Sequence, residues 1–185
     1  RKFHQTYEDT RILLRDDNGR GVHRQVRDGE VDFGISNQWY DYSELEYVPL
    51  TQDRFGLVCQ EDDPLAKKKG AINWYDIDPE RLFILAPDTG VHVALKGAPE
   101  LEDLLRKTAG EVLVMVTLLE MVQVGLGVTV LPELAAPRPG TGNLIFRPLS
   151  QPVLNRKLCL IRRRKEPLSP GARRAWEMLQ ALLPR

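Results

Sequence analysis

The most informative stretch of the chain passes from a helical to a strand-like pattern of apolar residues around two glycines. It reads Met-Val-Gln-Val-Gly-Leu-Gly-Val-Thr-Val-Leu-Pro over residues 121–132. Apolar positions up to Val122 form one helical stripe, and Gly125 can end that helix in a left-handed conformation without a Cβ penalty. Residues 128–131 are mostly apolar and β-branched, which predicts a strand covered on both faces that Pro132 ends. A helix that leads into a buried strand is typical of a parallel α/β sheet.

Two other segments repeat this order of elements and end in polar loops. A helix over 20–28 is expected to end at Gly29, and a strand over 31–35 then leads into a loop at Ser36 and Asn37. A second strand over 82–86 leads into a polar turn and a helix near Val91. Ligands of open α/β sheets bind outside the carboxyl ends of the strands. The loops at 36–37 and 87–91 are therefore where we expect a site.

The rest of the pattern predicts a chain that crosses twice between two groups of elements. The expected elements are a helix to about residue 8, a strand over 11–15, an extended pair at 46–50 and 53–59, a turn at 62–66, a short helix at 74–77, a helix over 91–108 that Pro99 breaks or restarts, a strand over 111–114, a helix over 115–124, strands at 144–146 and 157–161, and a last helix from Pro170 to about Leu183 that Ser169 caps.

The strands near 55–59 and 157–161 each link one group of elements to the other. If both are crossovers, the chain forms two lobes, 1–53 with 158–185 and 54–157, with a cleft between them. A compact α/β fold also needs a strand before residue 11. We therefore read the chain as starting inside its fold, with the first strand missing.

Composition indicates an ordinary globular protein. The chain has 185 residues, of which 42% are apolar and 28% charged, enough to bury roughly 70% of its unfolded surface. Lys and Arg number 26, as do Asp and Glu, so the formal net charge is zero. A net charge of zero argues against direct binding of nucleic acid by this chain alone. No apolar run approaches the roughly 20 residues of a membrane span.

The sequence contains no recognisable catalytic or metal-binding constellation. No two of the three His residues have metal-ligand spacing, and neither a nucleophile elbow nor a phosphate-loop lysine motif is present. We therefore expect no enzyme activity, no metal and no cofactor. Cys59 and Cys159 each lie in an apolar run, which favours buried reduced thiols of a cytosolic protein. A disulfide between neighbouring strands is the alternative. The basic run 162–165 precedes a proline turn and is interpreted as a solvated surface.

Four motifs in order make the chain resemble a known family. They are Val-Arg-Asp-Gly-Glu-Val-Asp-Phe-Gly-Ile at 26–35, Asp-Pro-Leu-Ala at 63–66, the 121–132 stretch, and Leu-Ser-Pro at 168–170 before the last helix. Together they resemble the effector-binding domain of LysR-type transcriptional regulators, over almost the whole chain. The family usually has His where this chain has Asp63, which we interpret as a tolerated change in a turn.

The resemblance implies a fold and a mechanism of regulation. It implies two Rossmann-like lobes joined by two crossover strands, similar to type II periplasmic binding proteins. A small effector, often a carboxylate or other anion, would bind in the cleft and shift the arrangement of a homodimer or homotetramer on DNA. DNA would be bound only through a winged helix-turn-helix that is absent from this chain. The resemblance further implies a cytoplasmic, bacterial regulator with no membrane partner.

Several polar residues at the predicted loops are candidate ligand contacts, each with a plain structural alternative. Ser36 and Asn37 could donate hydrogen bonds or simply form a turn. The backbone N–H groups of Gly90 and Val91 could hold an anion, with Asp88 and Thr89 either contacting the ligand or capping the helix. Asp88 would repel a carboxylate, which favours an effector with a cationic or donor group.

Two further candidates lie on the predicted elements that follow. Thr117 falls in the first turn of the 115–124 helix, where it could face the cleft, cap the helix or bond back to its own backbone. Phe146 could form a wall of the cleft or pack in the core.

Two other classes of function compete with the sensor domain. The first is a free-standing solute-binding protein of the same fold, which a secretion signal upstream would favour and a helix-turn-helix upstream would rule out. The second is an enzyme on the same scaffold, which requires a paired acid and base or a nucleophile that the sequence does not contain.

Overall fold

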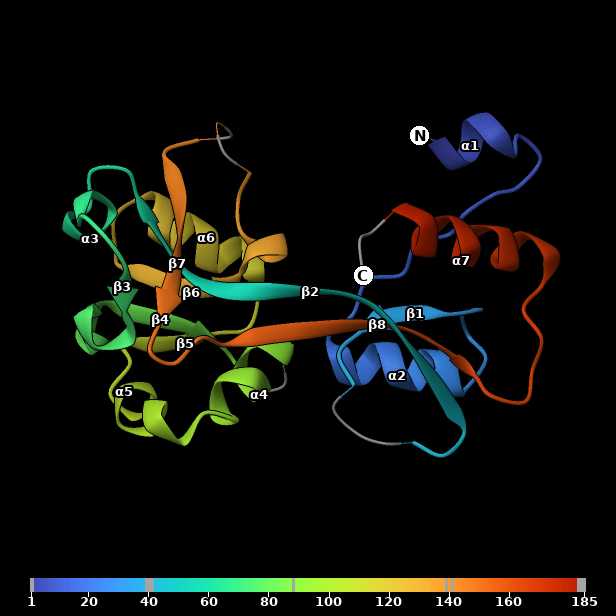
Figure 1. Cartoon of the computed structure of the whole chain (residues 1–185), viewed down its shortest axis with the longest axis horizontal. Coiled ribbons are helices and arrows are strands. Elements are labelled where there is room, and N and C mark those ends of the chain that lie inside the picture. Colours follow the sequence, from blue (N-terminus) through green and yellow to red (C-terminus); the bar gives the residue numbers. More distant parts are fainter. Residues whose placement is uncertain (1, 39–41, 88, 139, 141, 183–185) are drawn as a thin grey trace. The chain divides into compact units, whose positions relative to one another are not determined.

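The computed structural model describes residues 2–38, 42–87, 89–138, 140 and 142–182, and the chain divides into two compact units (Figure 1). Unit 1 comprises residues 1–52 and 157–185, and unit 2 comprises residues 53–156. Strands β2 (Leu45–Gln60) and β8 (Asn155–Arg163) have residues in both units. Among the described residues, no helix is long and apolar enough to cross a membrane.

Unit 1 is a small sheet with a helix on each face. Strand β1 (Gly34–Ser36) pairs antiparallel with β8, which is also hydrogen-bonded to β2. Because successive side chains of a strand point to opposite faces, Cys159 of β8 packs with the helix α2 (Gly19–Arg27), whereas Leu160 packs with α7 (Pro170–Leu182). The short helix α1 (Lys2–Thr6) completes the unit.

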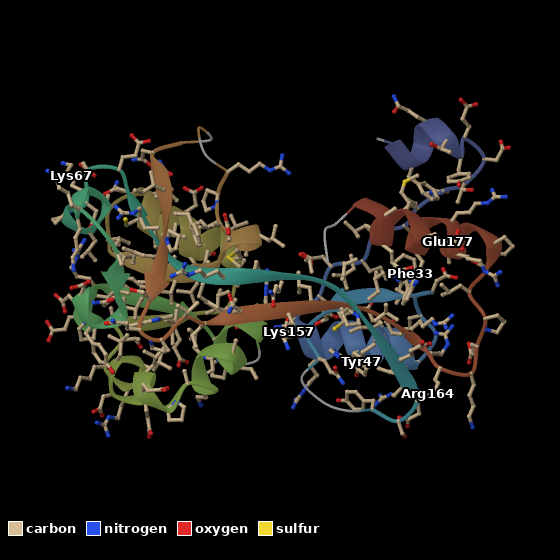
Figure 2. All side chains as sticks on the ribbon, in the orientation of Figure 1. Phe33, Tyr47, Lys67, Lys157, Arg164 and Glu177 are labelled. Atoms are coloured by element: carbon tan, nitrogen blue, oxygen red, sulfur yellow. The ribbon has the colours of Figure 1, made fainter. Side chains whose placement is uncertain are left out.

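Aromatic contacts mark the two faces of this sheet (Figure 2). Phe33 meets Trp176 of α7 edge to face, with ring centroids 5.6 Å apart. On the other face Tyr47 lies 5.7 Å from the ring of His23, which α2 contributes. At the start of α7 the Ser169 hydroxyl accepts a hydrogen bond from the Ala172 N–H at 3.3 Å, which confirms the predicted cap.

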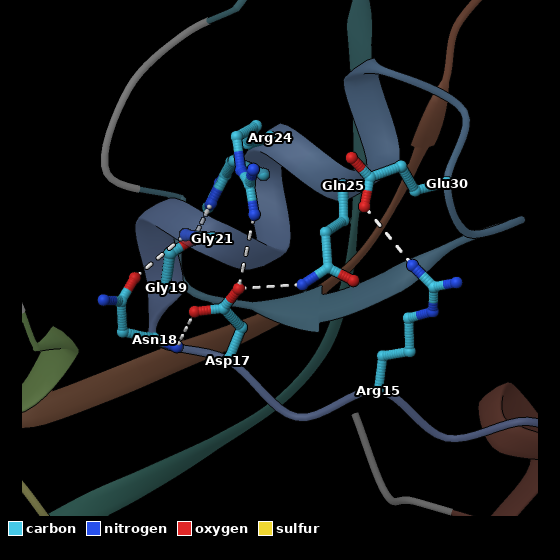
Figure 3. Close-up of polar contacts among 9 residues, drawn as sticks. Arg15, Asp17, Asn18, Gly19, Gly21, Arg24, Gln25 and Glu30 are labelled. Atoms are coloured by element: carbon cyan, nitrogen blue, oxygen red, sulfur yellow. Dashed lines mark hydrogen bonds and ion pairs between the residues drawn. The ribbon is translucent and has the colours of Figure 1, made fainter.

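Polar side chains fix the start of α2 (Figure 3). The Asn18 side chain accepts a hydrogen bond from the Gly21 N–H at 2.9 Å and so caps the helix. Asp17 accepts one from the Gln25 amide at 2.8 Å. The helix is followed by Gly29 at φ 74°, which confirms the helix end that the sequence predicted at this position.

The predicted strand over 11–15 is wrong. These residues have no regular secondary structure, and Ile12, Leu13 and Leu14 are 47%, 71% and 91% exposed. A strand needs a neighbour for its N–H and C=O groups, and no described strand pairs with this segment. The segment is held instead by polar contacts at its end, including a 3.3 Å ion pair between Arg15 and Glu30 (Figure 3).

Unit 2 contains a six-stranded mixed sheet. Its order is β5-β4-β6-β2-β7-β3. The new strands are β3 (Ile72–Asn73), β4 (Leu82–Leu85), β5 (Gly110–Val112), β6 (Val128–Pro132) and β7 (Leu144–Ser150). Strand β4 is parallel to both β5 and β6, whereas β2 is antiparallel to β6 and β7.

Short helices complete unit 2. They are α3 (Pro64–Lys67), α4 (Gly90–Lys96), α5 (Glu102–Arg106) and α6 (Met115–Gln123), with 3-10 turns η1 (Trp74–Asp76), η2 (Pro79–Arg81), η3 (Pro99–Leu101) and η4 (Glu133–Ala135). The predicted 91–108 helix is divided at Pro99, as the missing N–H of proline requires. The predicted turn at 62–66 is in part the one-turn helix α3.

The α6–β6 connection confirms the strongest sequence prediction. Gly125 has φ 81°, and the N–H of Leu126 bonds the Met121 carbonyl at 3.0 Å, which closes the end of the helix. A Cβ on Gly127 would lie 2.3 Å from the Arg81 carbonyl oxygen, so only glycine fits this close approach. All five residues of β6 are buried, as expected for a central strand.

The predicted extended pair at 46–50 and 53–59 is wrong, because the two segments form the single strand β2. Proline normally ends a strand by removing a ladder donor. Within unit 1, however, β2 lies at the edge of the described sheet, a position that tolerates a proline.

A buried ion pair fixes the place where β2 and β8 enter unit 2. Arg156 donates to both carboxylate oxygens of Asp53, from Nε at 3.0 Å and from Nη2 at 2.7 Å. The Leu134 N–H donates to the same carboxylate at 2.9 Å. The two charged side chains are only 4% and 14% exposed. One carboxylate thus joins β2, β8 and the turn after β6.

We predict that Asp53→Ala lowers the free energy of unfolding by about 3–5 kcal/mol, because it leaves the Arg156 guanidinium buried without a counter-charge. Urea unfolding of the purified chain measures the change. Asp103→Ala is the matched control, since the Asp103–Arg106 pair is 82% and 69% exposed and should contribute less than about 1 kcal/mol. Equal stability of the two variants would contradict this role for Asp53.

Candidate functional site

Three connections leave the sheet of unit 2 at the same edge. Because β4 is parallel to β5 and to β6, the carboxyl ends of all three strands lie together. The chain runs from β4 to β5 on one side and then returns to β6 on the other side of β4. The edge between β4 and β6 is therefore the switch point at which open α/β sheets bind ligands. We call the segments 86–91, 113–117 and 133–136 the carboxyl edge of unit 2.

The loop after β4 is closed by Thr89. Its hydroxyl donates to the Ala86 carbonyl at 2.8 Å and accepts from the His92 N–H at 3.3 Å, so Thr89 caps α4. The first N–H groups of a helix have no acceptor within the helix. Since Thr89 serves His92, the N–H groups of Gly90 and Val91 have no acceptor among the described residues. Asp88, also predicted to be in the site, lies outside the described residues.

His92 lies directly behind this loop and is 4% exposed. Its Nδ1 is 3.1 Å from the Leu85 carbonyl oxygen at the end of β4. A carbonyl oxygen can only accept, so Nδ1 carries a proton. No partner for this buried Nε2 lies within the described parts of the chain.

The sequence predicted a strand over 111–114, whereas β5 already ends at Val112, so Leu113 and Val114 lie in the connection to α6. Val114 occupies the N-cap position of α6 and has no side-chain group to bond the helix start. Thr117 lies in the first turn of α6, as predicted, and is exposed. The sequence did not predict that the apolar side chains beside it would be exposed. Leu113, Val114 and Val116 are 65%, 54% and 67% exposed. The apolar run 112–116 extends beyond the three-residue strand β5, so part of it stays exposed. The length of this run is the feature of the sequence that could have indicated exposed apolar side chains here.

The remaining predicted site residues lie elsewhere. Ser36 is the last residue of β1 in unit 1, is 6% exposed and pairs with Cys159; Asn37 follows it. Phe146 lies on β7, in register with Val58 of β2. A Cβ on Gly56 would lie 2.3 Å from the Phe146 ring, so this ring covers the backbone of β2 in the core of unit 2. Core packing accounts for Phe146 without a ligand.

A hollow of about 440 Å³ occurs in unit 1. It is lined by Arg27, Ser43, Glu44, Arg163, Arg164, Lys165 and Glu166. Arg163 donates to the Val26 and Val31 carbonyls, and Arg164 (labelled in Figure 2) donates to those of Ser43 and Leu45. These two guanidinium groups are thus used to hold the backbone of the unit itself. Within the described residues, no cluster of three or more His, Cys, Asp or Glu side chains could hold a metal ion.

Comparison with known proteins decides the family. The family model of the LysR substrate binding domain matches residues 1–184. The chain belongs to this family. It is 31% identical over 180 residues to the uncharacterized HTH-type transcriptional regulator YbhD of Escherichia coli K12, covering 96% of this chain and 56% of YbhD. The chain thus spans about half the length of this curated relative.

Solved structures show which fold the chain has. The effector-binding domain of QuiR in complex with shikimate matches with a TM-score of 0.82 at 16% identity, over 97% of this chain and 86% of that one. The CcmR regulatory domain of Synechocystis PCC6803 in complex with 2-PG matches with a TM-score of 0.80 at 17% identity, over 98% and 88%. The fold is therefore the two-lobed, type II periplasmic-binding-protein-like fold that the motifs implied.

The one departure from the family motif has a physical explanation. Asp63 caps α3 by accepting from the Leu65 N–H at 2.8 Å, and its second oxygen accepts from Arg81 at 2.5 Å. The side chain is 6% exposed, so this carboxylate is paired and bonded as a buried charge must be. In this chain, an ion pair thus holds the turn at which the family usually has His.

Both cysteines are free and buried, Cys59 in unit 2 and Cys159 in unit 1. Burial is the main cause that raises the pKa of the Cys59 thiol to about 12, with the Asp63 carboxylate adding to it. Burial also raises the pKa of Cys159. Because the thiolate is the reactive form, both thiols should be inert at neutral pH.

We predict that neither thiol reacts measurably with Ellman's reagent at pH 8 in the folded protein, whereas both react within minutes in 8 M urea. The folded-state pKa of Cys59 lies above the unfolded value, so its contribution to stability is full below pH 9 and declines as the pH rises from about 9 to 12. Cys59→Ser, which removes the titrating thiol, should flatten this decline. Rapid labelling of the native chain would contradict the assignment.

Proposed function

We propose that this chain is the effector-sensing part of a DNA-binding transcriptional regulator. The observation that carries the proposal is the carboxyl edge of unit 2, where the N–H groups of Gly90 and Val91, which have no acceptor among the described residues, follow β4 at the switch point of the sheet. Membership of the LysR substrate-binding family and the helix-turn-helix name of YbhD support the regulatory role. DNA contact would come from a segment outside these residues.

Within this proposal the predicted site residues have distinct roles. Thr89, Gly90 and Val91 would bind a hydrogen-bonding group of the effector, and Thr117 would contact it from the start of α6. Ser36 and Asn37 of unit 1 are proposed as further contacts, and Asp88 and Phe146 stay predictions of the sequence. QuiR with shikimate and CcmR with 2-PG are examples of related domains that hold a small molecule.

The effector would act by favouring one arrangement of the protein over another. A ligand shifts an equilibrium only through its different affinity for the two states. We propose that the states differ in the assembly of a homodimer or homotetramer, in the cytoplasm, where the regulator meets DNA. The proposal needs no chemistry at the site, only reversible binding.

We predict that a thermal-shift screen of small metabolites finds a ligand that raises the melting temperature of the chain. At about 100 times its Kd, such a ligand adds roughly 2.7 kcal/mol of stability. Thr89→Ala should then weaken its binding about three- to tenfold, the loss of one hydrogen bond. Thr89→Ser is the control, because it retains the hydroxyl and the helix cap.

The same titration tests unit 1 with Ser36→Ala. If neither Thr89→Ala nor Ser36→Ala changes the affinity of the ligand, while both remain folded, the proposed site is wrong. If a bound compound is turned over into product, the sensor role itself is contradicted.

A further inference from the structure

The hollow in unit 1 combines the size of a ligand pocket with a local excess of positive charge. Its volume of about 440 Å³ lies within the range of small-molecule pockets, about 300–1,000 Å³. Four of the side chains that line it are cationic and two are anionic, in a chain whose formal net charge is zero. The four cations are Arg27, Arg163, Arg164 and Lys165.

Two of these four cations have no counter-charge. Arg27 and Arg163 each form an ion pair with a nearby carboxylate. Neither Arg164 nor Lys165 forms an ion pair with a carboxylate in the parts of the chain that the structure describes. Their charges are therefore available to an anion.

Arg164 is held in place by uncharged groups. Its Nε donates to the Ser43 carbonyl at 3.1 Å, and its Nη2 donates to the Leu45 carbonyl at 3.0 Å. A guanidinium group has five N–H donors, so about three of them have no acceptor among the described residues. Because the two carbonyl groups already fix the orientation of this guanidinium, little side-chain entropy is lost when an anion binds it.

The two neighbours of this arginine in the sequence supply further donors. Nη1 of Arg163 donates to the Val26 and Val31 carbonyls at 2.6 and 3.2 Å, and its Nε donates to Glu166, so its Nη2 is without an acceptor in the described residues. Lys165 adds an ammonium group. Three separate donor groups suit the three terminal oxygens of a phosphate monoester better than the two oxygens of a carboxylate.

One carboxylate of the lining sets a second requirement. The Glu44 side chain accepts a hydrogen bond from the Ser43 hydroxyl at 3.3 Å and forms no ion pair within the described residues. It would repel a second anionic group of a ligand. It can accept hydrogen bonds from hydroxyl groups instead, so it favours a ligand whose body is neutral and hydroxylated.

We propose that this hollow is a second small-molecule site, which binds a phosphate monoester with a hydroxylated body such as a sugar phosphate. Its phosphate group bonds Arg163, Arg164 and Lys165, and Glu44 accepts from a hydroxyl group. This inference does not rest on the proposed function, because none of the proposed effector contacts lines the hollow.

Isothermal titration calorimetry of the chain with ribose 5-phosphate, in a phosphate-free buffer at neutral pH, tests this proposal. Saturable binding at one site per chain is expected, whereas ribose, which lacks the charged group, should not bind at the same concentrations. Lys165→Gln should weaken the binding of ribose 5-phosphate about tenfold, because it removes one charge-assisted hydrogen bond. No described residue depends on the Lys165 side chain for a hydrogen bond or ion pair, so this variant should fold normally.

Matched measurements separate a specific site from general attraction of anions. Lys157→Gln makes the same change at the other end of β8, on an exposed side chain labelled in Figure 2, and should leave the affinity unchanged. Ribose 5-phosphate should also bind more tightly than inorganic phosphate, and Glu44→Ala should remove that difference.

The other outcomes overturn the proposal. The site is absent if ribose 5-phosphate does not saturate the chain at millimolar concentration, or if Lys165→Gln and Lys157→Gln have equal effects. If a mixed-sequence DNA duplex binds more tightly than ribose 5-phosphate and loses affinity with Lys165→Gln, the hollow binds the phosphate groups of DNA and the small-molecule assignment is wrong. None of these results affects the proposed contacts of the effector.

Discussion

Because β4 pairs in parallel with both β5 and β6, three separate connections of the chain leave the sheet of unit 2 at one edge. The proposed ligand contacts of unit 2 depend on that constraint. It turns loops whose first residues are 20 or more positions apart along the chain into neighbours, and it puts the start of α4 and the start of α6 at the same edge. Local chemistry alone would not have singled out these loops, since the contacts of the Thr89 hydroxyl with Ala86 and His92 are those of an ordinary helix cap.

The pairing is possible because the sequence makes β6 suitable for the centre of a sheet. All its residues are buried, and Gly127 allows the strand to begin against the backbone of Arg81. The Asp53–Arg156 pair then holds the turn after β6 through the Leu134 N–H. Removing either charge would leave the other unpaired, so the end of β6 and the entry of β2 and β8 are fixed together.

Much of this architecture could be predicted from the chain, for identifiable reasons. The helix end at Gly125, the buried strand after it and the Ser169 cap follow from local chemistry that tertiary contacts do not override. The family motifs supplied the fold, because four weak signals in one order are specific together.

The sequence predictions that are wrong also have local causes. The 11–15 segment has the composition of a strand, but a strand forms only beside another, and no described strand pairs with it. The strand β2 was predicted as two segments, 46–50 and 53–59, because sequence alone does not reveal which neighbours a strand pairs with. At the site, the positions of Thr89 and Thr117 followed from element boundaries, whereas the exposed Leu113 and Val116 required knowing where β5 ends.

The most direct test of the account is a crystal structure of this chain with a compound from the screen bound. The account predicts electron density within hydrogen-bonding distance of the Gly90 and Val91 N–H groups and in contact with Thr117. Density confined to another surface, such as the hollow lined by Arg163 and Arg164 in unit 1, would contradict it.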